Sequence, residues 1–464
     1  MHHIHRNLAG DVTRVELEGN RWHVDFERDP LGLELSRTLP NGITSRWERD
    51  VVGRPMRRTV THQGEKVLDD KRYVWDGDDQ IRAILDPQHG DAHYKHDARG
   101  RLVWGRMPWG EEQHRAMDAV GNIFRTPDLS DRRYGKGGRI EEADGTTYRH
   151  DEDGNLVEKT DVLGDTTLYR WNGAGMLDSV LLPDGREVSF EYDVMARRLG
   201  KRVEESGEVR KEVRWAWDGA NPLREINSQQ GACHWVVDPE TFSPLAKLSS
   251  KNVWGVLTDQ LACPTDLLSE RGERVWSGER DLLGANVLGH NQTECTWVWP
   301  GQQHDGDVGL IYNRYRFLDP STGRYVSSDP VGIYGGSHSY AYVTDPLRGT
   351  DPLGLSEGCG EDISADEIRD INRAPGGSTE LTGSADTVIA NMMYREGRTA
   401  KAAVAIRDIA GRHLFDDANK RTAQAVAERI LGDTVAPSTV RRAIDQVATG
   451  GLRGIEDIVG ALSG

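Results

Sequence analysis

The chain has 464 residues, which predicts two to four domains, and its 36% hydrophobic and 29% charged residues indicate a soluble, rather hydrophilic protein. Its formal charge of −17 excludes a general binder of nucleic acid or anionic membranes, because such binding needs a basic face. Four widely spaced cysteines without a C-x-x-C pair exclude a zinc ribbon and a disulfide-dense scaffold: Cys233, Cys263, Cys295 and Cys359.

The sequence contains no sign of a membrane span or a signal peptide. No apolar run approaches the roughly 18 residues that a spanning helix needs. The first residues, Met1 to His5, lack the apolar core of a signal peptide. If the protein leaves its cell, another apparatus must therefore carry it.

Composition divides the chain near Leu355. All 13 tryptophans lie between Trp22 and Trp299, in a part that is rich in Gly, Arg and Asp. The residues after Leu355 are rich in Ala and Ile at helical spacing. We therefore expect a β-rich front part and a helical tail.

A short turn motif is repeated along the front part. In each copy the Asp can hydrogen-bond its own turn, the Gly can take a positive φ, and the preceding residue, often aromatic, can pack on the sheet. One D-x-x-G would be a common hairpin turn, but copies in register predict successive hairpins. The copies are spaced 21 residues apart in two sets: Asp76, Asp97 and Asp118, then Asp151, Asn172 and Asp193.

These repeats resemble the YD repeats of Rhs proteins, the family that includes insecticidal toxin-complex C subunits and teneurins. The resemblance implies an all-β shell of coiled hairpins, here over residues 1–300, that encloses a C-terminal cargo. The region is short for a complete shell and no N-terminal PAAR-like segment is visible, so we expect a fragment or a truncated relative. The repeat aspartates and aromatic residues are then structural rather than catalytic.

Residues 301–355 resemble the Rhs core signature. Two Asp-Pro-x-Gly motifs begin at Asp329 and Asp351, at the spacing of the self-cleaving form of that family. The resemblance implies a self-cleaving aspartyl protease junction in which Arg316 acts beside the two aspartates. It also implies a cut between Leu355 and Ser356, which would free the tail.

The chemistry of such a junction also follows from first principles. Two carboxylates that are held close together cannot both ionise cheaply, so they are expected to share a proton. One of them then activates water while the other protonates the carbonyl oxygen or the leaving amine. We assign these tasks to Asp329 and Asp351, whereas other Asp-Pro pairs of the chain are expected only to start turns.

The tail, residues 356–464, has the spacing of an all-α domain with one polar loop between two helices. The loop runs from His413 to Arg421 and leads into a helix N-terminus, where unpaired N–H groups favour phosphate. His413 can take a proton from a hydroxyl, and Asp417 can ligate Mg²⁺. Asn419 and Arg421 can hold phosphate oxygens.

This loop resembles the Fic motif, and its Ala418 and Lys420 resemble the Doc branch of that family in particular. The resemblance implies ATP and Mg²⁺ as cofactors and phosphoryl transfer to a threonine of elongation factor Tu, which blocks translation. The implied catalytic residues are His413, Asp417 (also the metal ligand), Asn419, Lys420 and Arg421, of which the last three also bind the nucleotide.

The sequence thus predicts a multidomain antibacterial toxin effector, with an all-β YD-repeat shell, a self-cleaving junction and a small all-α Fic/Doc domain. The expected partners are a target protein in the recipient cell, a cognate immunity protein and a secretion apparatus such as a type VI spike, and the tail is expected to act in the recipient cytoplasm. Three alternatives remain open. They are a Fic-type adenylyltransferase, a YD-repeat surface adhesion protein with an inert tail, and a tail that only binds an immunity partner.

Overall fold

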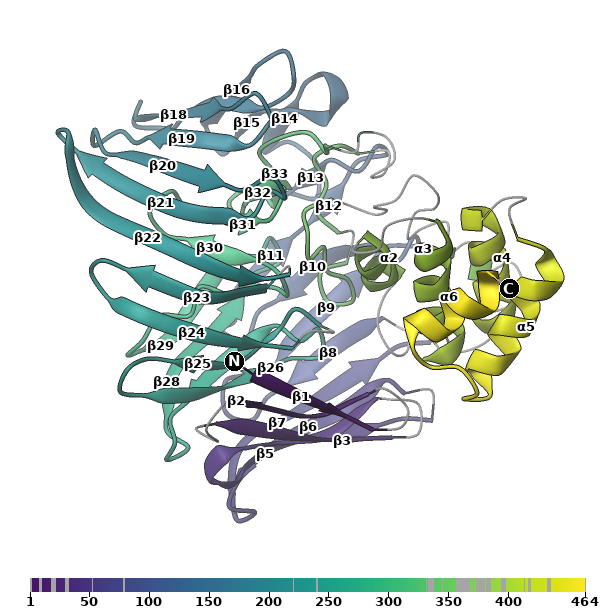
Figure 1. Ribbon diagram of the computed structural model, residues 1–464. Helices are drawn as coiled ribbons and strands as arrows, with labels where there is room; N and C mark the ends of the chain where they lie inside the picture. The colour runs from purple at the N-terminus through teal and green to yellow at the C-terminus, as the bar shows by residue number, and fades with distance from the viewer. Residues whose placement is uncertain are drawn as a thin grey trace. The chain divides into compact units, whose positions relative to one another are not determined.

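The chain forms two compact units in the computed structural model, whose helices and strands are labelled in Figure 1. One unit comprises Met1–Asp91, Tyr334–Gly336 and Glu357–Gly464, and the other comprises Ala92–Ile333 and Ser337–Ser356. The structure describes residues 2–7, 11–17, 22–29, 33–51, 53–77, 80–219, 221–238, 241–330, 332, 338–343, 345–355, 368–369, 371–372, 380, 385–393, 398–412, 414–415, 419–431 and 435–463.

The first unit begins with eight strands that follow one another in a sheet in chain order, each antiparallel to the next. Side chains alternate between the two faces, so that Ile43, Ser45 and Trp47 of one strand are buried together. The strands are β1 (His2–Arg6), β2 (Val12–Leu17), β3 (His23–Arg28), β4 (Glu34–Leu39), β5 (Ile43–Arg49), β6 (Pro55–His62), β7 (Lys66–Trp75) and β8 (Ile81–Leu85), with the short helix η1 (Pro40–Gly42) before β5.

The described part of the tail is helical, as expected from its spacing. The elements are α2 (Ala385–Met393), α3 (Arg398–Ala405), the π-helical segment η4 (Ile406–Gly411), α4 (Asn419–Leu431), α5 (Pro437–Ala448) and α6 (Ile455–Ser463). In α4 the buried positions Ala423, Val426, Ala427, Ile430 and Leu431 repeat at three or four residues and form one apolar face.

The second unit is built from antiparallel strands. A large sheet in chain order runs from β14 to β29, and four short strands, green in Figure 1, form a sheet of their own. The strands are β9 (Ala92–His96), β10 (Leu102–Arg106), β11 (Glu112–His114), β12 (Ala116–Met117), β13 (Ile123–Phe124), β14 (Arg132–Tyr134), β15 (Ile140–Ala143), β16 (Thr146–His150), β17 (Leu156–Thr160), β18 (Thr166–Trp171), β19 (Leu177–Leu181), β20 (Glu187–Tyr192), β21 (Arg198–Glu205), β22 (Glu208–Asp218), β23 (Asn221–Asn227), β24 (Gly231–Val237), β25 (Pro244–Leu248), β26 (Val253–Thr258), β27 (Pro264–Leu268), β28 (Arg274–Arg280), β29 (Asn286–Asn291), β30 (Gln303–Asp305), β31 (Leu310–Asn313), β32 (Arg316–Asp319) and β33 (Arg324–Tyr325), with the short helix η2 (Lys136–Gly138) before β15.

The repeated turns have the predicted geometry. Asp97 accepts the backbone N–H of Arg99 at 2.9 Å and that of Arg101 at 3.0 Å, and Gly100 has φ +77°. The same two side-chain contacts recur in the turns of Asp118, Asn172 and Asp193. The turn of Asp151 shows the second contact, to the backbone N–H four residues later. The repeat is therefore a hairpin turn that its own Asp or Asn fixes.

The aromatic residue before the turn ties neighbouring hairpins together. Its polar atom donates to a backbone carbonyl of an earlier strand at 2.8 Å in three successive cases: Trp171 to Leu156, Tyr192 to Leu177 and Trp217 to Arg198. These residues are structural, as the sequence predicts.

The short sheet β30–β33 is buried on both faces. One face packs into a cluster with the large sheet through Leu310, Tyr312, Phe317 and Val326. The other face contributes Ile311, Leu318 and Tyr325 to a second cluster with Trp299 and Tyr342. Polar side chains at the ends of these strands are therefore held far from water, and they form the site described next.

Candidate functional site

The hairpin that joins β31 and β32 positions two buried polar side chains. Asn313 and Arg316 face each other across this hairpin, and Arg314 at its turn takes φ +49°. Asn313 is 0% exposed and Arg316 is 1% exposed. A buried guanidinium needs anionic and polar partners, and they come from the segments that follow β33.

Arg316 links the two predicted aspartates. Its Nη2 atom lies 3.0 Å from Oδ2 of Asp329 and 3.4 Å from Oδ2 of Asp351. Its Nη1 atom donates to the carbonyl of Ser339 at 3.1 Å, and its guanidinium lies 3.6 Å from the centre of the Tyr325 ring. The sequence prediction that these three charged residues come together is thus correct in its geometry.

The shared proton expected from the sequence remains a prediction. A guanidinium lies beside both carboxylates, and its positive charge offsets their mutual repulsion. The site is an arginine-bridged pair of carboxylates.

Asp351 holds the backbone that follows it. Its Oδ1 atom accepts the N–H groups of Gly354 at 2.9 Å and Leu355 at 3.1 Å. Its Oδ2 atom accepts the hydroxyl of Tyr325 at 2.7 Å in addition to Arg316. Burial and the neighbouring Asp351 charge raise the pKa of Tyr325 well above its ordinary value, so the phenol keeps its proton.

The carbonyl groups of the same segment are also held. Gln302 and Asn313 donate side-chain N–H groups to the carbonyl of Asp351 at 3.0 and 2.8 Å. The backbone N–H of Tyr315 donates to Leu353 at 3.2 Å, and Nε of Arg316 donates to Gly354 at 2.5 Å. Residues 351–355 thus lie in a cradle of hydrogen bonds.

The cradle requires glycine at position 354. Gly354 has φ +71°, and a Cβ atom there would lie 2.4 Å from the carbonyl oxygen of Asn313. Leu355, the residue before the predicted cut, is 2% exposed, and Ser356 lies outside the described residues. The structure therefore fixes the chain up to the predicted scissile bond.

Three further residues of this site received no role from the sequence. Gln302, Asn313 and Tyr325 all lie within the Rhs core signature, but their residue types suggest no chemistry on their own. They matter because the fold turns them towards Asp351. Their role in the site can therefore be recognised only from the folded structure.

In the tail, the structure describes part of the predicted nucleotide loop. His413 and Asp417 lie outside the described residues. Asn419, at the first position of α4, accepts the backbone N–H of Phe415 at 2.8 Å and donates to its carbonyl at 2.6 Å. Asn419 therefore bonds both backbone groups of Phe415, and a contact with phosphate remains a prediction.

Lys420 and Arg421 follow Asn419 in the first turn of helix α4. Lys420 is half-exposed, and its Nζ atom lies 3.1 Å from Asp445 of α5, which also contacts Arg441 at 3.3 Å. Arg421 is exposed. Their roles in nucleotide binding also remain predictions, whereas Phe415 is buried in the core.

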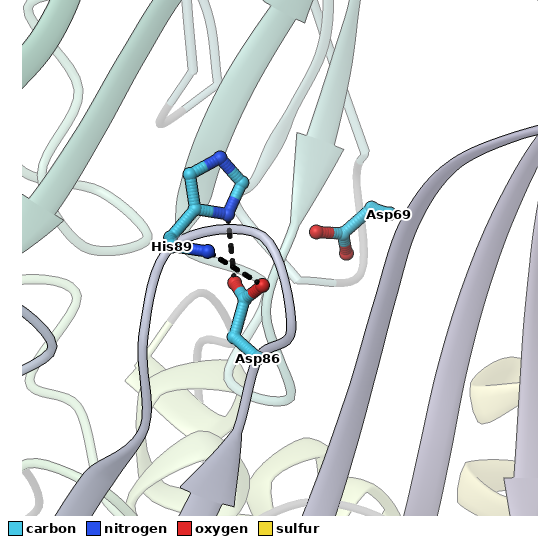
Figure 2. Close-up of side chains that lie close together, drawn as sticks. All are labelled: Asp69, Asp86 and His89. Carbon is cyan, nitrogen blue, oxygen red and sulfur yellow. Dashed lines mark hydrogen bonds and ion pairs between the residues drawn. The ribbon is translucent and has the colours of Figure 1, made fainter.

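In the first unit, Asp69, Asp86 and His89 bring possible metal ligands within 4.8 Å of one another (Figure 2). Each carboxylate already has its own cation, because Arg58 lies 2.5 Å from Asp69 and Lys71 lies 3.3 Å from Asp86. His89 donates its backbone N–H to Asp86 and places Nδ1 2.8 Å from it. A divalent ion would be repelled by both cations, so we interpret the group as an ion-pair network around two buried carboxylates, with His89 at its exposed side.

Two exclusions made from the sequence can be compared with the described residues. No helix in this part of the chain combines the length and apolar character that are needed to cross a membrane. Cys233, Cys263 and Cys295 are free thiols.

Comparison with known proteins identifies the β-rich part. The family model described as Teneurin YD-shell matches residues 50–335. The chain is 27% identical over 386 residues to double-stranded DNA deaminase toxin A of Burkholderia cenocepacia, which covers 75% of this chain and 27% of that protein. Over 379 residues it is 28% identical to the probable deoxyribonuclease RhsA of Dickeya dadantii, with 76% of this chain and 26% of the relative covered.

The toxin protein Tse5 of Pseudomonas aeruginosa is 28% identical over 429 residues, covering 76% of this chain and 32% of Tse5. The chain thus spans about a quarter to a third of the length of these curated relatives.

Solved structures confirm the fold of the β-rich part. The crystal structure of TcdB2-TccC3-Cdc42 superposes with a TM-score of 0.55 at 17% identity, and the match covers 76% of this chain and 20% of that one. Since the family model spans well over half of the residues, the chain belongs to the Teneurin YD-shell family.

Proposed function

We propose that this chain is part of a toxin effector whose YD-shell region releases its own C-terminal tail. The observation that carries the proposal is the arrangement of Arg316, Asp329 and Asp351 around the backbone that ends at Leu355. The names of three relatives, a deaminase toxin, a probable deoxyribonuclease and the toxin Tse5, support a toxin.

The reaction is hydrolysis of the peptide bond between Leu355 and Ser356. A water oxygen adds to the carbonyl carbon of Leu355, and a carboxylate of the site takes a proton from that water. The bond from this carbon to the nitrogen of Ser356 then breaks, and the nitrogen takes up the proton. The products are a new carboxylate at Leu355 and a new amine at Ser356.

The cradle supports this reaction because the substrate is part of the fold. Holding a reacting group in place acts like a large effective concentration of that group. Residues 351–355 are held in this way at their amides and carbonyls. The guanidinium of Arg316, next to the carbonyl of Gly354, supplies a positive charge close to the peptide that is attacked.

The experiment compares wild-type and Asp329→Asn chains on a denaturing gel after expression. We expect the wild-type chain to give two fragments and the variant to remain at full length. Asp184→Asn, which changes an exposed turn carboxylate, is the matched control and should cleave normally. Cleavage of the Asp329→Asn chain at the same bond would contradict the proposal and indicate an outside protease.

We further propose that the released tail, residues 356–464, is a Doc-like protein phosphotransferase. The support is the sequence from His413 to Arg421 together with the helix that begins at Asn419, whose N-terminal turn carries two cations. Mg²⁺-bound ATP would supply the phosphoryl group. His413 would take the proton of the target hydroxyl, Asp417 would hold the metal, and Asn419, Lys420 and Arg421 would hold the phosphates.

The target by resemblance is a threonine of elongation factor Tu, and the runner-up reaction is AMP transfer to a protein hydroxyl. Delivery by a secretion apparatus such as a type VI spike, action in the recipient cytoplasm and a cognate immunity protein belong to the same proposal. The bacterial cell that carries this tail would need such an immunity protein, because its own translation would otherwise be blocked.

The test incubates the self-cleaved full chain with bacterial lysate and ATP labelled at either the γ or the α position. We expect protein-bound label from the γ position, and its loss in His413→Ala. Lys420→Gly should reduce this transfer, because the cation then no longer orders the phosphates. Label from the α position alone would overturn the Doc-like reaction in favour of AMP transfer.

A further inference from the structure

The carboxylate of Asp351 in the cleavage site is saturated with hydrogen-bond donors. A carboxylate offers about four acceptor positions. In Asp351 all of them are in use: two backbone N–H groups on Oδ1, and the Tyr325 hydroxyl and Arg316 on Oδ2. To take a proton from water, Asp351 would first have to give up one of these donors.

The direction of the bond between Tyr325 and Asp351 is determined by a third side chain. The Nδ2 group of Asn313 donates to the carbonyl of Asp351 at 2.8 Å, and a carbonyl can only accept. The same Nδ2 group donates to the Tyr325 oxygen at 2.7 Å. The phenol proton of Tyr325 is therefore left to point at Asp351.

Tyr325 is also held by its ring. The guanidinium of Arg316 packs on one face at 3.6 Å, and the ring belongs to the buried cluster with Trp299 and Tyr342. Tyr325 is 3% exposed. Its hydroxyl therefore has little freedom to move away from Asp351.

We propose that Tyr325 and Asp351 form one positioning unit, and that Asp329 alone accepts the proton of the attacking water. The unit holds the N–H groups of Gly354 and Leu355, so that the carbonyl of Leu355 is presented for attack. This inference rests on the self-cleavage proposed above. Asp329 returns the proton to the nitrogen of Ser356 when the peptide bond breaks, and water is the only co-reactant.

The experiment follows cleavage of the full chain after a pulse of cell-free translation, at a series of pH values. Tyr325→Phe keeps the ring but loses the hydroxyl, and should slow cleavage on the order of 10- to 100-fold without moving the pH profile. Asp351→Asn keeps an oxygen for the two N–H groups and should cleave slowly with the same profile. Asp329→Asn should lose about 10²–10⁴-fold in rate, because the base is missing.

The double variant Tyr325→Phe with Asp351→Asn separates positioning from general damage. If Tyr325 acts through Asp351, the double variant should be no slower than Asp351→Asn alone. Tyr192→Phe, which also removes one buried hydroxyl hydrogen bond but lies in the repeat sheet, is the matched control and should cleave at the wild-type rate. Tryptophan fluorescence on heating checks that each variant is folded.

Three results would overturn the inference. They are a wild-type cleavage rate in Tyr325→Phe, a double variant whose rate is reduced by the product of the two single reductions, or a shifted pH profile of the cleavage rate in Asp351→Asn. Failure of the wild-type chain to cleave would instead refute the proposed self-cleavage itself. The two failures are therefore distinguishable.

Discussion

The segment 301–355 and the segment from His413 to Arg421, which leads into α4, are both rich in polar side chains, but these side chains differ in burial. In the first, Arg316, Asp329 and Asp351 are buried and in contact with one another. In the second, Lys420 and Arg421 reach solvent. A site that acts on its own chain can bury its substrate during folding, whereas a site for an outside molecule has to stay accessible. Under the proposed functions, the burial of the polar groups thus matches the origin of each substrate, which is the chain itself in the first case and an outside molecule in the second.

The largest expected effect comes from removing the buried cation. Arg316→Met should lower the free energy of unfolding by about 3–5 kcal/mol, because two buried carboxylates lose their partner. Arg421→Met, on the exposed face of α4, should change it by less than about 0.5 kcal/mol. Denaturant unfolding followed by far-ultraviolet circular dichroism measures both changes, because the tail that carries Arg421 contains no tryptophan for fluorescence to report on. Equal effects of the two substitutions would break the comparison.

A second pair of variants compares a glycine of the cradle with a glycine of the helical tail. Gly354→Ala places a Cβ atom 2.4 Å from the carbonyl oxygen of Asn313 and should slow self-cleavage about 100-fold, because the cradle shifts. Gly460→Ala in α6 meets nothing within 4 Å and should raise helix stability by about 0.5–1 kcal/mol without affecting cleavage. Cleavage time courses on gels and thermal unfolding measure the two results. Normal cleavage in Gly354→Ala would count against a rigid cradle.

The loss of stability in acid should be larger for a buried ion pair than for an exposed one. Burial raises the pKa of Asp305, but Lys201 and Arg198 hold it lower, at about 2. Because this pKa is depressed below that of the unfolded chain, Asp305 contributes about 2–3 kcal/mol above pH 4, and the contribution is lost as the pH falls from 4 to 2. Asp305→Asn should flatten this part of the stability curve, and Asp445→Asn, on the exposed pair with Lys420, should leave it unchanged. If the stability of Asp305→Asn still fell steeply between pH 4 and pH 2, the loss in acid could not be assigned to Asp305.

The smallest effect concerns the repeat turns. Ala196 takes φ +57° in a turn where most other copies carry glycine. Ala196→Gly should therefore raise the stability of the second unit by about 0.5–1 kcal/mol, since glycine adopts this conformation without strain. Gly185→Ala, at φ +87° with open space around it, should lower stability by a similar amount. Thermal unfolding of both variants checks the opposite signs.

Much of the β-rich part was predictable because each repeat is a local signal. An Asp two residues before its own N–H partner, and a glycine with positive φ, act within one turn and are visible in the sequence. The contact of Arg316 with Asp329 and Asp351 was predicted through the resemblance to the Rhs core signature. The tail helices followed from apolar spacing.

The rest depended on tertiary structure. Tyr325 and Asn313 act on Asp351 across 26 and 38 residues, and no local pattern joins them. The shared proton inferred from the two carboxylates stays a prediction, and the structure adds that one guanidinium contacts both of them. The pairing of Lys420 with Asp445 likewise joins two helices that the sequence presents separately.

The most direct test of the central claim is the mass of the small fragment that the wild-type chain produces in a translation system made only of purified, protease-free components. The account predicts a fragment that begins at Ser356 and ends at Gly464, which appears at a rate independent of chain concentration because the reaction is intramolecular. An intact, folded chain, or a fragment that begins at any other residue, would contradict it.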